Sequence, residues 1–360
     1  MPHPLGTAQG VPVTLVGVDE ARATPICLDR DVPTRPYASP PGPLRVRPAC
    51  HGHDPYQEAV LREALACLQA YQDAHPDWWA IQAANSCRVP STAPTGRALV
   101  ACVEAAEREP GASRWAHALH TNESEAPIRV VGEDRTYVLP ARSAFLLTDL
   151  LPWPPRVPYG WDSVCALVHA YNGASVVMVD PPWPNQSARR VHSRSAHGYR
   201  TVEDVYEMWR VRPAIEALLG PDTLLAVWVT NAPRIQRFVV EKLMPALGLV
   251  HQATWAWLKV TAPEPGTRPE PVVPLDGDAG FRRAYELVLL GARTPQAVTP
   301  RHILVSVPLA HSAKPYLGGV LGRRGVMVEL FARHVSQGSP MHISVGNEAV
   351  LGNEVREVGM

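Results

Sequence analysis

The residue types best suited to chemistry stand together in the tetrapeptide Asp180-Pro181-Pro182-Trp183, directly after the apolar run Val176–Val179. Two successive prolines cannot continue the hydrogen bonding of a sheet, so the chain must leave a strand there in a stiff, extended form. An aromatic amine such as N6 of adenine is a poor nucleophile, because its lone pair is delocalised into the ring. A carboxylate and a proline carbonyl that accept its two N–H groups would direct this lone pair at a methyl donor, while the tryptophan stacks on the base. The tetrapeptide therefore predicts a catalytic pocket for an exocyclic amine, and the alternative is a tight turn with a capping aspartate and a packed tryptophan.

A basic segment follows the tetrapeptide. Between Gln186 and Arg200 it contains four arginines, two histidines and no acidic residue. Contacts from such a segment to phosphates would position a nucleic acid strand without reading its sequence. We therefore expect Arg189, Arg190 and Arg194 to bind the acceptor, and the alternative is a solvated surface loop.

The elements that would position these residues are short apolar runs that recur from about residue 143 onward. Two stretches with helical spacing, 202–219 and 234–247, separate some of these runs. Buried strands that alternate with helices predict an α/β domain with a mostly parallel sheet covered on both faces. Ligands bind such sheets beyond the carboxyl ends of the strands, so the polar residues directly after each run are candidates for a site. The runs are Ala144–Leu147, Ser175–Val179, Leu224–Val229, Glu286–Leu290, Ile303–Val307 and Val326–Phe331.

The first 140 residues have a different character. Residues 32–44 are rich in proline and are expected to form an extended arm. Apolar residues at three- and four-residue spacing predict an amphipathic helix over Tyr56–Tyr71, and a weak alternation predicts a hairpin over Ile128–Leu139. We therefore expect an N-terminal accessory α+β domain over residues 1–140 and a catalytic domain over residues 141–360.

Composition limits the possible functions. Of the 360 residues, 46% are hydrophobic and 19% are charged, as in an ordinary globular protein, and the formal net charge is zero. Proteins that grip a long duplex mainly through its phosphates are usually basic, so this class is disfavoured. The six cysteines show no Cys-x-x-Cys pair and no zinc-like spacing, so we expect no metal. Because no secretory signal is evident and no apolar run reaches the roughly 18–20 residues of a membrane span, we expect an intracellular protein, nuclear or cytoplasmic, without a membrane partner.

A series of further motifs accompanies the tetrapeptide: Asn185 and Ser187, Trp228–Asn231, Tyr285-Glu286, Ser306–Pro308, His311-Ser312, Lys314-Pro315, Glu329–Arg333 and Gly346–Glu348. With these motifs in this order, residues 141–350 resemble the eukaryotic adenine-N6 methyltransferases, the family that includes the messenger-RNA N6-methyladenosine writer. Within that family the sequence is most similar to the branch called methyltransferase-like protein 4, to which Asn185, Ser187 and Asn231 in particular point. Many motifs in one order are far more specific than the tetrapeptide alone.

The resemblance implies a Rossmann-like fold in which the catalytic strand precedes the main cofactor strand, with S-adenosyl-L-methionine as cofactor. It implies that Asp149 and Leu150 lie at the adenine of this donor, and that Lys314 meets its carboxylate, a role suited to the point charge of lysine. Ribose hydroxyls would be bound around Arg333, Asn347 and Glu348, and Asp180 would adjoin the donor as well. The positions implied for the acceptor, beside the three arginines, are Asn185, Ser187, Asn231, Tyr285 and Glu286.

The sequence departs from the family pattern at two positions. Members usually carry histidine where this chain has Ala313, and some carry glycine where it has Ala332. Neither change removes a charged contact. We therefore expect weaker or shifted donor binding and no loss of activity.

The resemblance also implies an acceptor, because this branch is associated with an already 2′-O-methylated adenosine in the U2 small nuclear RNA. RNA is therefore the expected partner, with the chain active as a monomer. Three alternatives remain: methylation of DNA adenine, a non-catalytic subunit that only binds nucleic acid, and an amide-N methyltransferase with the related Asn-Pro-Pro-aromatic motif. The joint presence of Asp180, Trp183 and Lys314 disfavours the second alternative, and aspartate in place of asparagine disfavours the third.

Overall fold

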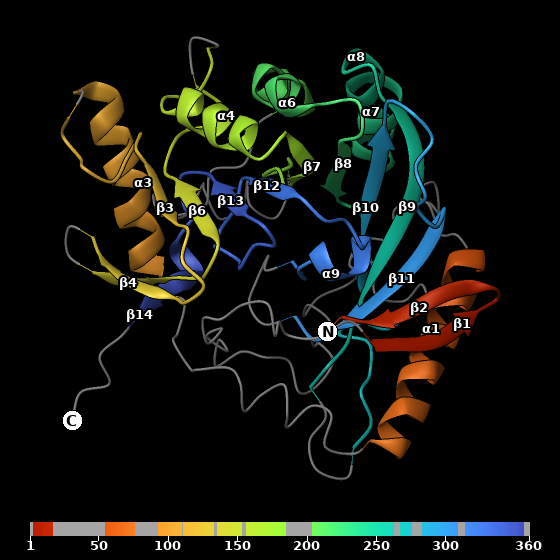
Figure 1. The fold of residues 1–360 in the computed structure, drawn as a ribbon. Helices are drawn as coiled ribbons and strands as arrows, with labels where there is room; N and C mark the ends of the chain where they lie inside the picture. The colour runs from red at the N-terminus through yellow and green to blue at the C-terminus, as the bar shows by residue number, and fades with distance from the viewer. Residues whose placement is uncertain are drawn as a thin grey trace, which may run out of the picture.

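The centre of the protein is one sheet of eleven strands in the order β1-β2-β11-β9-β10-β8-β7-β12-β13-β6-β3 (Figure 1). The computed structural model describes residues 3–16, 55–75, 93–109, 111–132, 135–152, 156–184, 204–262, 267–275, 283–308 and 314–355. Neighbours from β8 through β7, β12 and β13 to β6 are parallel, whereas β10 is antiparallel to both β8 and β9. The predicted α/β fold with a mostly parallel, Rossmann-like sheet is confirmed. The strands are β1 (His3–Ala8), β2 (Val11–Leu15), β3 (Leu119–Asn122), β6 (Ser143–Leu146), β7 (Ala174–Val179), β8 (Leu224–Val229), β9 (Val250–Lys259), β10 (Tyr285–Ala292), β11 (Arg301–Ser306), β12 (Val326–Leu330) and β13 (His342–Val345).

Both faces of the central strands are covered. All six residues of β8 are buried, as expected for a strand inside a parallel sheet. On one face Val177 and Val328 pack in a cluster with α4 (Trp161–Ala170), α6 (Arg212–Leu218) and α7 (Pro233–Phe238), which lie along the upper side of Figure 1. On the opposite face Trp228 packs in a second cluster with Leu317 and with Leu321 of α9 (Gly318–Leu321).

The two helices predicted over 202–219 and 234–247 are present but interrupted. The first consists of the 3₁₀ turn η1 (Val205–Val211) followed by α6, and the second of α7, the π turn η2 (Val239–Leu243) and α8 (Met244–Ala246). A proline marks the start of the last segment in each stretch. Pro213 and Pro245 each stand in the first turn of the segment that follows, where their missing N–H is tolerated.

Segments before residue 141 contribute to the same large sheet. The hairpin β1–β2 joins it through parallel pairing of β2 with β11, and β3 pairs with β6 at the other edge. The predicted helix is confirmed as α1 (Pro55–Ala74), whose Leu61 and Leu68 pack on Val13 of β2 and Ile303 of β11. A separate accessory domain is not confirmed, and the boundary at residue 140 stays a prediction. The proline-rich stretch 32–44 lies outside the described residues.

A second, smaller sheet holds the strands β14 (Glu354–Val355), β5 (Thr136–Leu139) and β4 (Ile128–Val131). β4 and β5 are antiparallel, which confirms the predicted hairpin. Behind it, α3 (Ala93–Arg108) contributes Leu99 and Val103 to a cluster with Tyr137 and Leu139 of β5. The 3₁₀ turn η4 (Leu351–Asn353) leads into β14.

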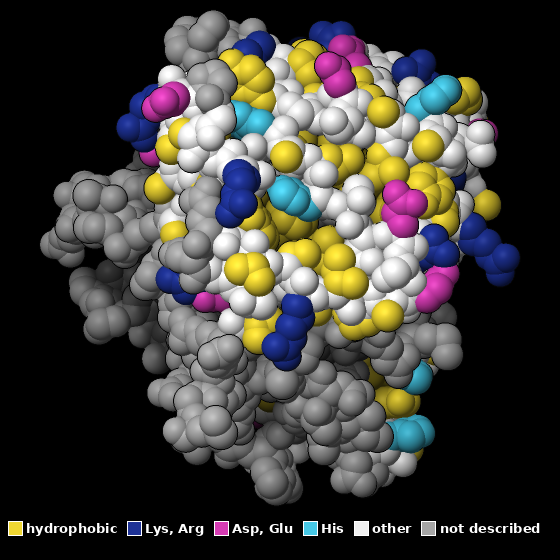
Figure 2. Space-filling model, turned by 60° about the vertical axis from the view of Figure 1, so that its left-hand side comes forward, with side chains coloured by type: hydrophobic (Ala, Val, Ile, Leu, Met, Phe, Trp, Pro, Cys, Tyr) yellow, Lys and Arg dark blue, Asp and Glu magenta, His cyan; other side chains and the backbone are white. Residues whose placement is uncertain are grey.

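The surface on this side has no continuous basic area within the described part of the chain. Figure 2, which brings the left-hand side of Figure 1 forward, shows hydrophobic side chains gathered over the middle of this face, with charged side chains spread around them singly or in pairs. None of the described helices has the length and apolar character needed to cross a membrane.

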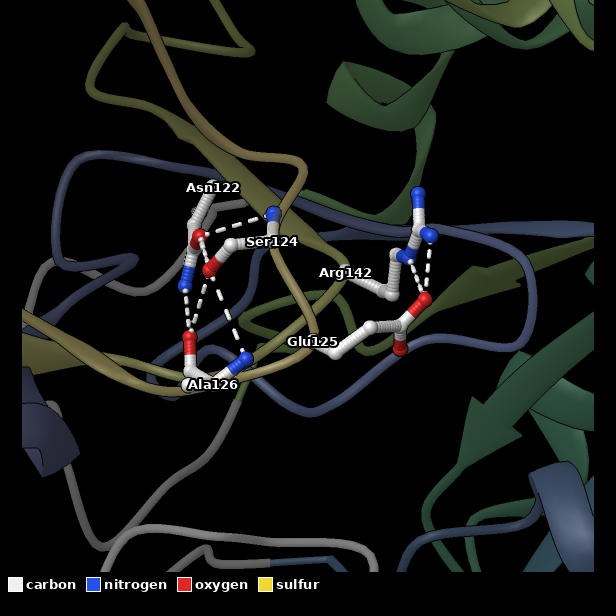
Figure 3. Close-up of polar contacts among 5 residues, drawn as sticks. All are labelled: Asn122, Ser124, Glu125, Ala126 and Arg142. Atoms are coloured by element: carbon white, nitrogen blue, oxygen red, sulfur yellow. Dashed lines mark hydrogen bonds and ion pairs between the residues drawn. The ribbon is translucent and has the colours of Figure 1, made fainter.

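The connection from β3 to β4 is a tight, hydrogen-bonded turn (Figure 3). The side-chain amide of Asn122 donates to the carbonyl of Ala126 at 2.9 Å, and the hydroxyl of Ser124 donates to Oδ1 of Asn122 at 2.7 Å. Beside it, Nε of Arg142, in the connection from β5 to β6, donates to Oε1 of Glu125 at 2.9 Å. These contacts hold the two connections together and so fix the start of β6.

Candidate active site

The strand directions bring Asp180, Glu286 and Lys259 to one edge of the sheet. Asp180 directly follows β7, and Lys259 is the last residue of β9. β10 runs antiparallel to β8 and β9, so Glu286, its second residue, lies at the edge where β8 and β9 end. This is the edge where the reasoning from the sequence placed ligands.

Lys314 joins these residues into a network of alternating charges. Its Nζ lies 3.1 Å from Oδ1 of Asp180 and 3.1 Å from Oε2 of Glu286, and Nζ of Lys259 donates to Oε1 of Glu286. The four side chains are largely buried, with exposed fractions of 18% for Asp180, 25% for Glu286, 12% for Lys314 and 20% for Lys259. Buried charges are tolerated when they are paired in this way.

The pKa values in the network are displaced in different directions. Burial raises the pKa of Asp180 to about 6, against the effect of Lys314 and with a contribution from Glu286 and Glu329. Burial also acts to raise the pKa of Glu286, but Lys314 and Lys259 outweigh it and lower this pKa to about 2. Burial acts to lower the pKa of Lys314, whereas Asp180 and Glu286 raise it well above its usual value. At neutral pH Glu286 and Lys314 are therefore charged, and the pKa of Asp180 lies only about one unit below neutral pH.

The tetrapeptide forms a tight turn at the end of β7. The N–H of Asp180 donates to the carbonyl of Leu330 on β12 at 3.1 Å, and the N–H of Trp183 donates to the carbonyl of Pro181 at 2.8 Å. Pro182, which is also buried, completes the turn between them. The sequence therefore folds as expected from two prolines that follow a buried strand.

Trp183 is packed into the protein. Its side chain is 5% exposed, its Nε1 donates to the carbonyl of Trp228 at 2.7 Å, and its ring meets Phe238 edge-on at 6.4 Å. These contacts fix the end of the turn. Stacking of the ring on a base stays a prediction.

The residues predicted to surround the donor follow three neighbouring parallel strands. Asp149 and Leu150 come after β6, Arg333 after β12, and Asn347 with Glu348 after β13. Oδ1 of Asp149 accepts the N–H of Leu151 at 2.8 Å, and Leu150 is buried in the core. Nε of Arg333 lies 3.1 Å from Oε2 of Glu348, a carboxylate with 10% of its side chain exposed.

Backbone contacts hold these three segments together. The N–H of Thr148 donates to the carbonyl of Gly346 at 3.3 Å, and the N–H of Ala332 donates to that of Val345 at 3.0 Å. A side chain at Gly346 would meet the carbonyl of Ala332 at 3.1 Å, so glycine allows the close approach. The structure thus brings the predicted donor residues to one edge of the sheet, beside Asp180, and their contacts with the donor stay predictions.

The residues predicted to bind the acceptor divide into two groups. Nδ2 of Asn231 donates to the carbonyl of Tyr285 at 2.6 Å, which ties the end of β8 to the start of β10, and Glu286 is held by two lysines. The other residues predicted to bind the acceptor lie outside the described part of the chain: Asn185, Ser187, Arg189, Arg190 and Arg194. Ala313, the departure expected to affect donor binding, lies outside it as well.

Lys259 was not predicted from the sequence as a member of the site. The signal was present, since Lys259 directly follows the buried residues Trp255–Leu258 and so meets the criterion of a polar residue at the end of an apolar run. In the described ranges, no group of three or more His, Cys, Asp or Glu residues could hold a metal ion.

Comparison with known proteins matches residues 174–348 to the MT-A70 family. The chain is 34% identical over 179 residues to "N6-methyladenosine RNA methyltransferase MTA1" of Pyricularia oryzae, which covers 46% of this chain and 44% of that protein. It is 30% identical over 232 residues to "N(6)-adenine-specific methyltransferase METTL4" of Homo sapiens, with 59% and 43% covered. It is 29% identical over 185 residues to "DNA N6-methyl methyltransferase" of Caenorhabditis elegans, with 49% and 46% covered.

The chain spans less than half the length of these three relatives. Among solved structures, "crystal structure of M1.HpyAVI-SAM complex" covers 52% of this chain and 93% of that chain at 10% identity, and its TM-score of 0.31 supports no conclusion. The family match and the resemblance of the motifs agree. Residues 174–348 therefore match the MT-A70 family, and the chain is similar to proteins named as N6-adenine methyltransferases.

Proposed function

We propose that this protein transfers a methyl group from S-adenosyl-L-methionine to N6 of an adenine in RNA. The observation that carries the proposal is the position of Asp180, which directly follows a buried strand, pairs through its carboxylate with Lys314, and donates its N–H to the carbonyl of Leu330 on β12. An acceptor amine placed there would find a hydrogen-bond acceptor at the sheet edge where ligands bind. The donor residues implied by the family lie at the same edge.

The residues at this edge fit the proposed donor. Glu348 and Asn347 offer acceptors to hydroxyl groups, and Asp149 offers a carboxylate after β6. Bound S-adenosyl-L-methionine would supply an electrophilic methyl group. Lys314 binds the carboxylates of Asp180 and Glu286 at this edge, and its proposed contact with the donor carboxylate follows from its match to the lysine of the family motif.

Asp180 has two proposed tasks in the reaction. As a carboxylate it accepts an N–H of the amine, which makes the nitrogen lone pair more available for bond formation. The nitrogen gains a carbon and must lose a proton, and Asp180, with a pKa of about 6, is placed to take it and pass it to solvent. Lys314 keeps this carboxylate largely ionised at neutral pH in spite of its burial.

RNA is the preferred acceptor for two physical reasons. A chain of zero net charge offers little of the distributed phosphate neutralisation that duplex binding requires. A looped adenosine also avoids the unpairing cost of a few kcal/mol that extraction from a duplex demands. By resemblance to its branch, we propose a 2′-O-methylated adenosine in a small nuclear RNA such as U2. We also propose that the protein acts in the nucleus or the cytoplasm and that it is active as a monomer.

A second candidate is methylation of adenine in DNA, because one relative is named as a DNA methyltransferase. The test compares methyl incorporation into RNA and DNA oligonucleotides of matched sequence, with and without 2′-O-methylation at the target adenosine. The proposal predicts the fastest incorporation into the 2′-O-methylated RNA. Faster incorporation into DNA would favour the second candidate, and no incorporation into any of them would favour a non-catalytic subunit.

A further inference from the structure

We propose that Lys259 is a positioning residue for methyl transfer: by holding Glu286, it leaves Lys314 to Asp180 and so keeps the Asp180 carboxylate charged. The effect of Lys259 on methyl transfer rests on the proposed function. Its effect on the charge of Asp180 rests on the ion-pair network alone. Lys259 touches neither donor nor acceptor in this scheme. It acts through Glu286 and Lys314.

The geometry holds Lys259 firmly in place. Its backbone N–H donates to the carbonyl of Ala284 at 2.7 Å, and its Nζ donates to Glu286 and lies 4.7 Å from the ring centre of Trp257. That ring is itself fixed, because Nε1 of Trp257 donates to Oγ of Ser306 at 2.8 Å. An ammonium over an aromatic face is favourably placed, and more so where water is largely excluded.

The charges of the network explain why Lys259 matters to Asp180. Lys259, Glu286, Lys314 and Asp180 alternate in sign and sum to zero, and Glu286 is shared between both lysines. Without Lys259, the whole charge of Glu286 would fall on Lys314. Lys314 would then be drawn away from Asp180, and an uncompensated anion would remain nearby. Both effects disfavour ionised Asp180.

The other charged groups near Asp180 come from neighbouring strands. Glu329 on β12 adds a second nearby anion, and its Oε2 lies 3.4 Å from Nε2 of His342 on β13. Among the described residues, Lys314 is the cation in contact with Asp180, and Lys259 contacts the other oxygen of Glu286. Removal of Lys259 therefore shifts the balance around Asp180 toward negative charge.

The test is the pH dependence of kcat/KM for methylation in three variants. Lys259→Met should move the acid limb of the profile upward by about one pH unit, so that activity falls about fivefold at pH 6 and about tenfold below pH 5. Activity should approach that of the wild type above pH 8.5, with an unchanged KM for the donor. Lys259→Arg should restore the profile. Lys242→Met, at an exposed lysine of η2, is the matched control and should not change it.

The double variant Lys259→Met/Glu286→Gln tests the sign of the effect. It removes the anion that Lys259 compensates, so the acid limb should return to the wild-type pH or below it, whatever the height of the profile. An acid limb that stays in place in Lys259→Met, or that moves further up in the double variant, would overturn the proposal.

A second readout does not depend on activity. Titration of the Asp180 carboxyl by carbon NMR, assigned with Asp180→Asn, should show a higher midpoint in Lys259→Met than in wild type. If the wild type methylates no adenine, the proposed function fails. The titration still shows whether Lys259 lowers the pKa of Asp180. Equal midpoints in the two proteins would refute the role of Lys259 even in an active enzyme.

Discussion

Asparagine in place of Asp180 is expected to abolish methyl transfer and to make the protein more stable. Burial moves the pKa of Asp180 from 3.8 to about 6, so the folded state holds the neutral form more tightly than the unfolded chain does. One pKa unit corresponds to about 1.36 kcal/mol, so the charge on Asp180 costs the folded state about 3 kcal/mol at neutral pH. The amide of asparagine avoids this cost, and its oxygen can still accept from Lys314.

The sign of the pH dependence follows from the raised pKa. Above pH 6, Asp180 is ionised in both states and the full cost is present. As pH falls from 6 to 4, the folded state takes up a proton first, the cost declines, and below both pKa values it is gone. The advantage of Asp180→Asn should therefore be about 3 kcal/mol at pH 7 and roughly half of that at pH 5.

Urea unfolding of wild type and Asp180→Asn at the two pH values measures this advantage. Asp222→Asn, at an exposed aspartate, is the control and should change the free energy of unfolding by less than about 0.5 kcal/mol. A variant that is equally stable or less stable than wild type at pH 7 would refute the reasoning. Such a result would mean that the ion pair between Asp180 and Lys314 stabilises the folded state by more than burial of the Asp180 carboxylate destabilises it.

Three further outcomes are expected. Lys314→Ala should weaken binding of S-adenosyl-L-methionine by about 1.5–3 kcal/mol in calorimetry, and an unchanged Kd would remove Lys314 from the donor site. Trp183→Ala should lower activity about 5–150-fold through lost stacking and, because the ring is 5% exposed, destabilise the fold by about 3–5 kcal/mol. Full activity of its folded fraction would make Trp183 a packing residue only. Neutralising Arg189, Arg190 and Arg194 together should flatten the salt dependence of RNA binding by up to about three phosphate contacts and leave donor affinity unchanged, and an unaltered slope would contradict their role.

Much of the catalytic half of the fold could be predicted from local patterns. The run before Asp180 is apolar throughout, and two prolines follow shortly after it. Neighbouring residues therefore predict both the strand and the point where it ends. Both stretches of helical spacing are helical, but the helix type changes along each of them, and Pro213 and Pro245 stand in the first turn of the last segments. The spacing of apolar residues indicates which face of a helix is buried. It does not register that a proline lacks the N–H needed for a helical hydrogen bond.

The arrangement of the strands could not be predicted in the same way. β1 and β2 join the sheet through β11, 290 residues later in the chain, and β9 and β10 place Lys259 beside Glu286 by antiparallel pairing. Such pairings depend on which strands neighbour each other. A single sequence carries no local mark of that order, so Lys259 was recognisable as a polar residue after a strand but not as the partner of Glu286.

The most direct test of the central claim is mass spectrometry of nucleosides from RNA incubated with a donor labelled in its methyl group. The wild type should place the label on N6 of adenosine, and of 2′-O-methyladenosine where that nucleoside is present. Asp180→Asn, which should be folded and bind the donor, should yield no more than a few per cent of this product. Label on any other atom, or undiminished N6 label with Asp180→Asn, would contradict the account.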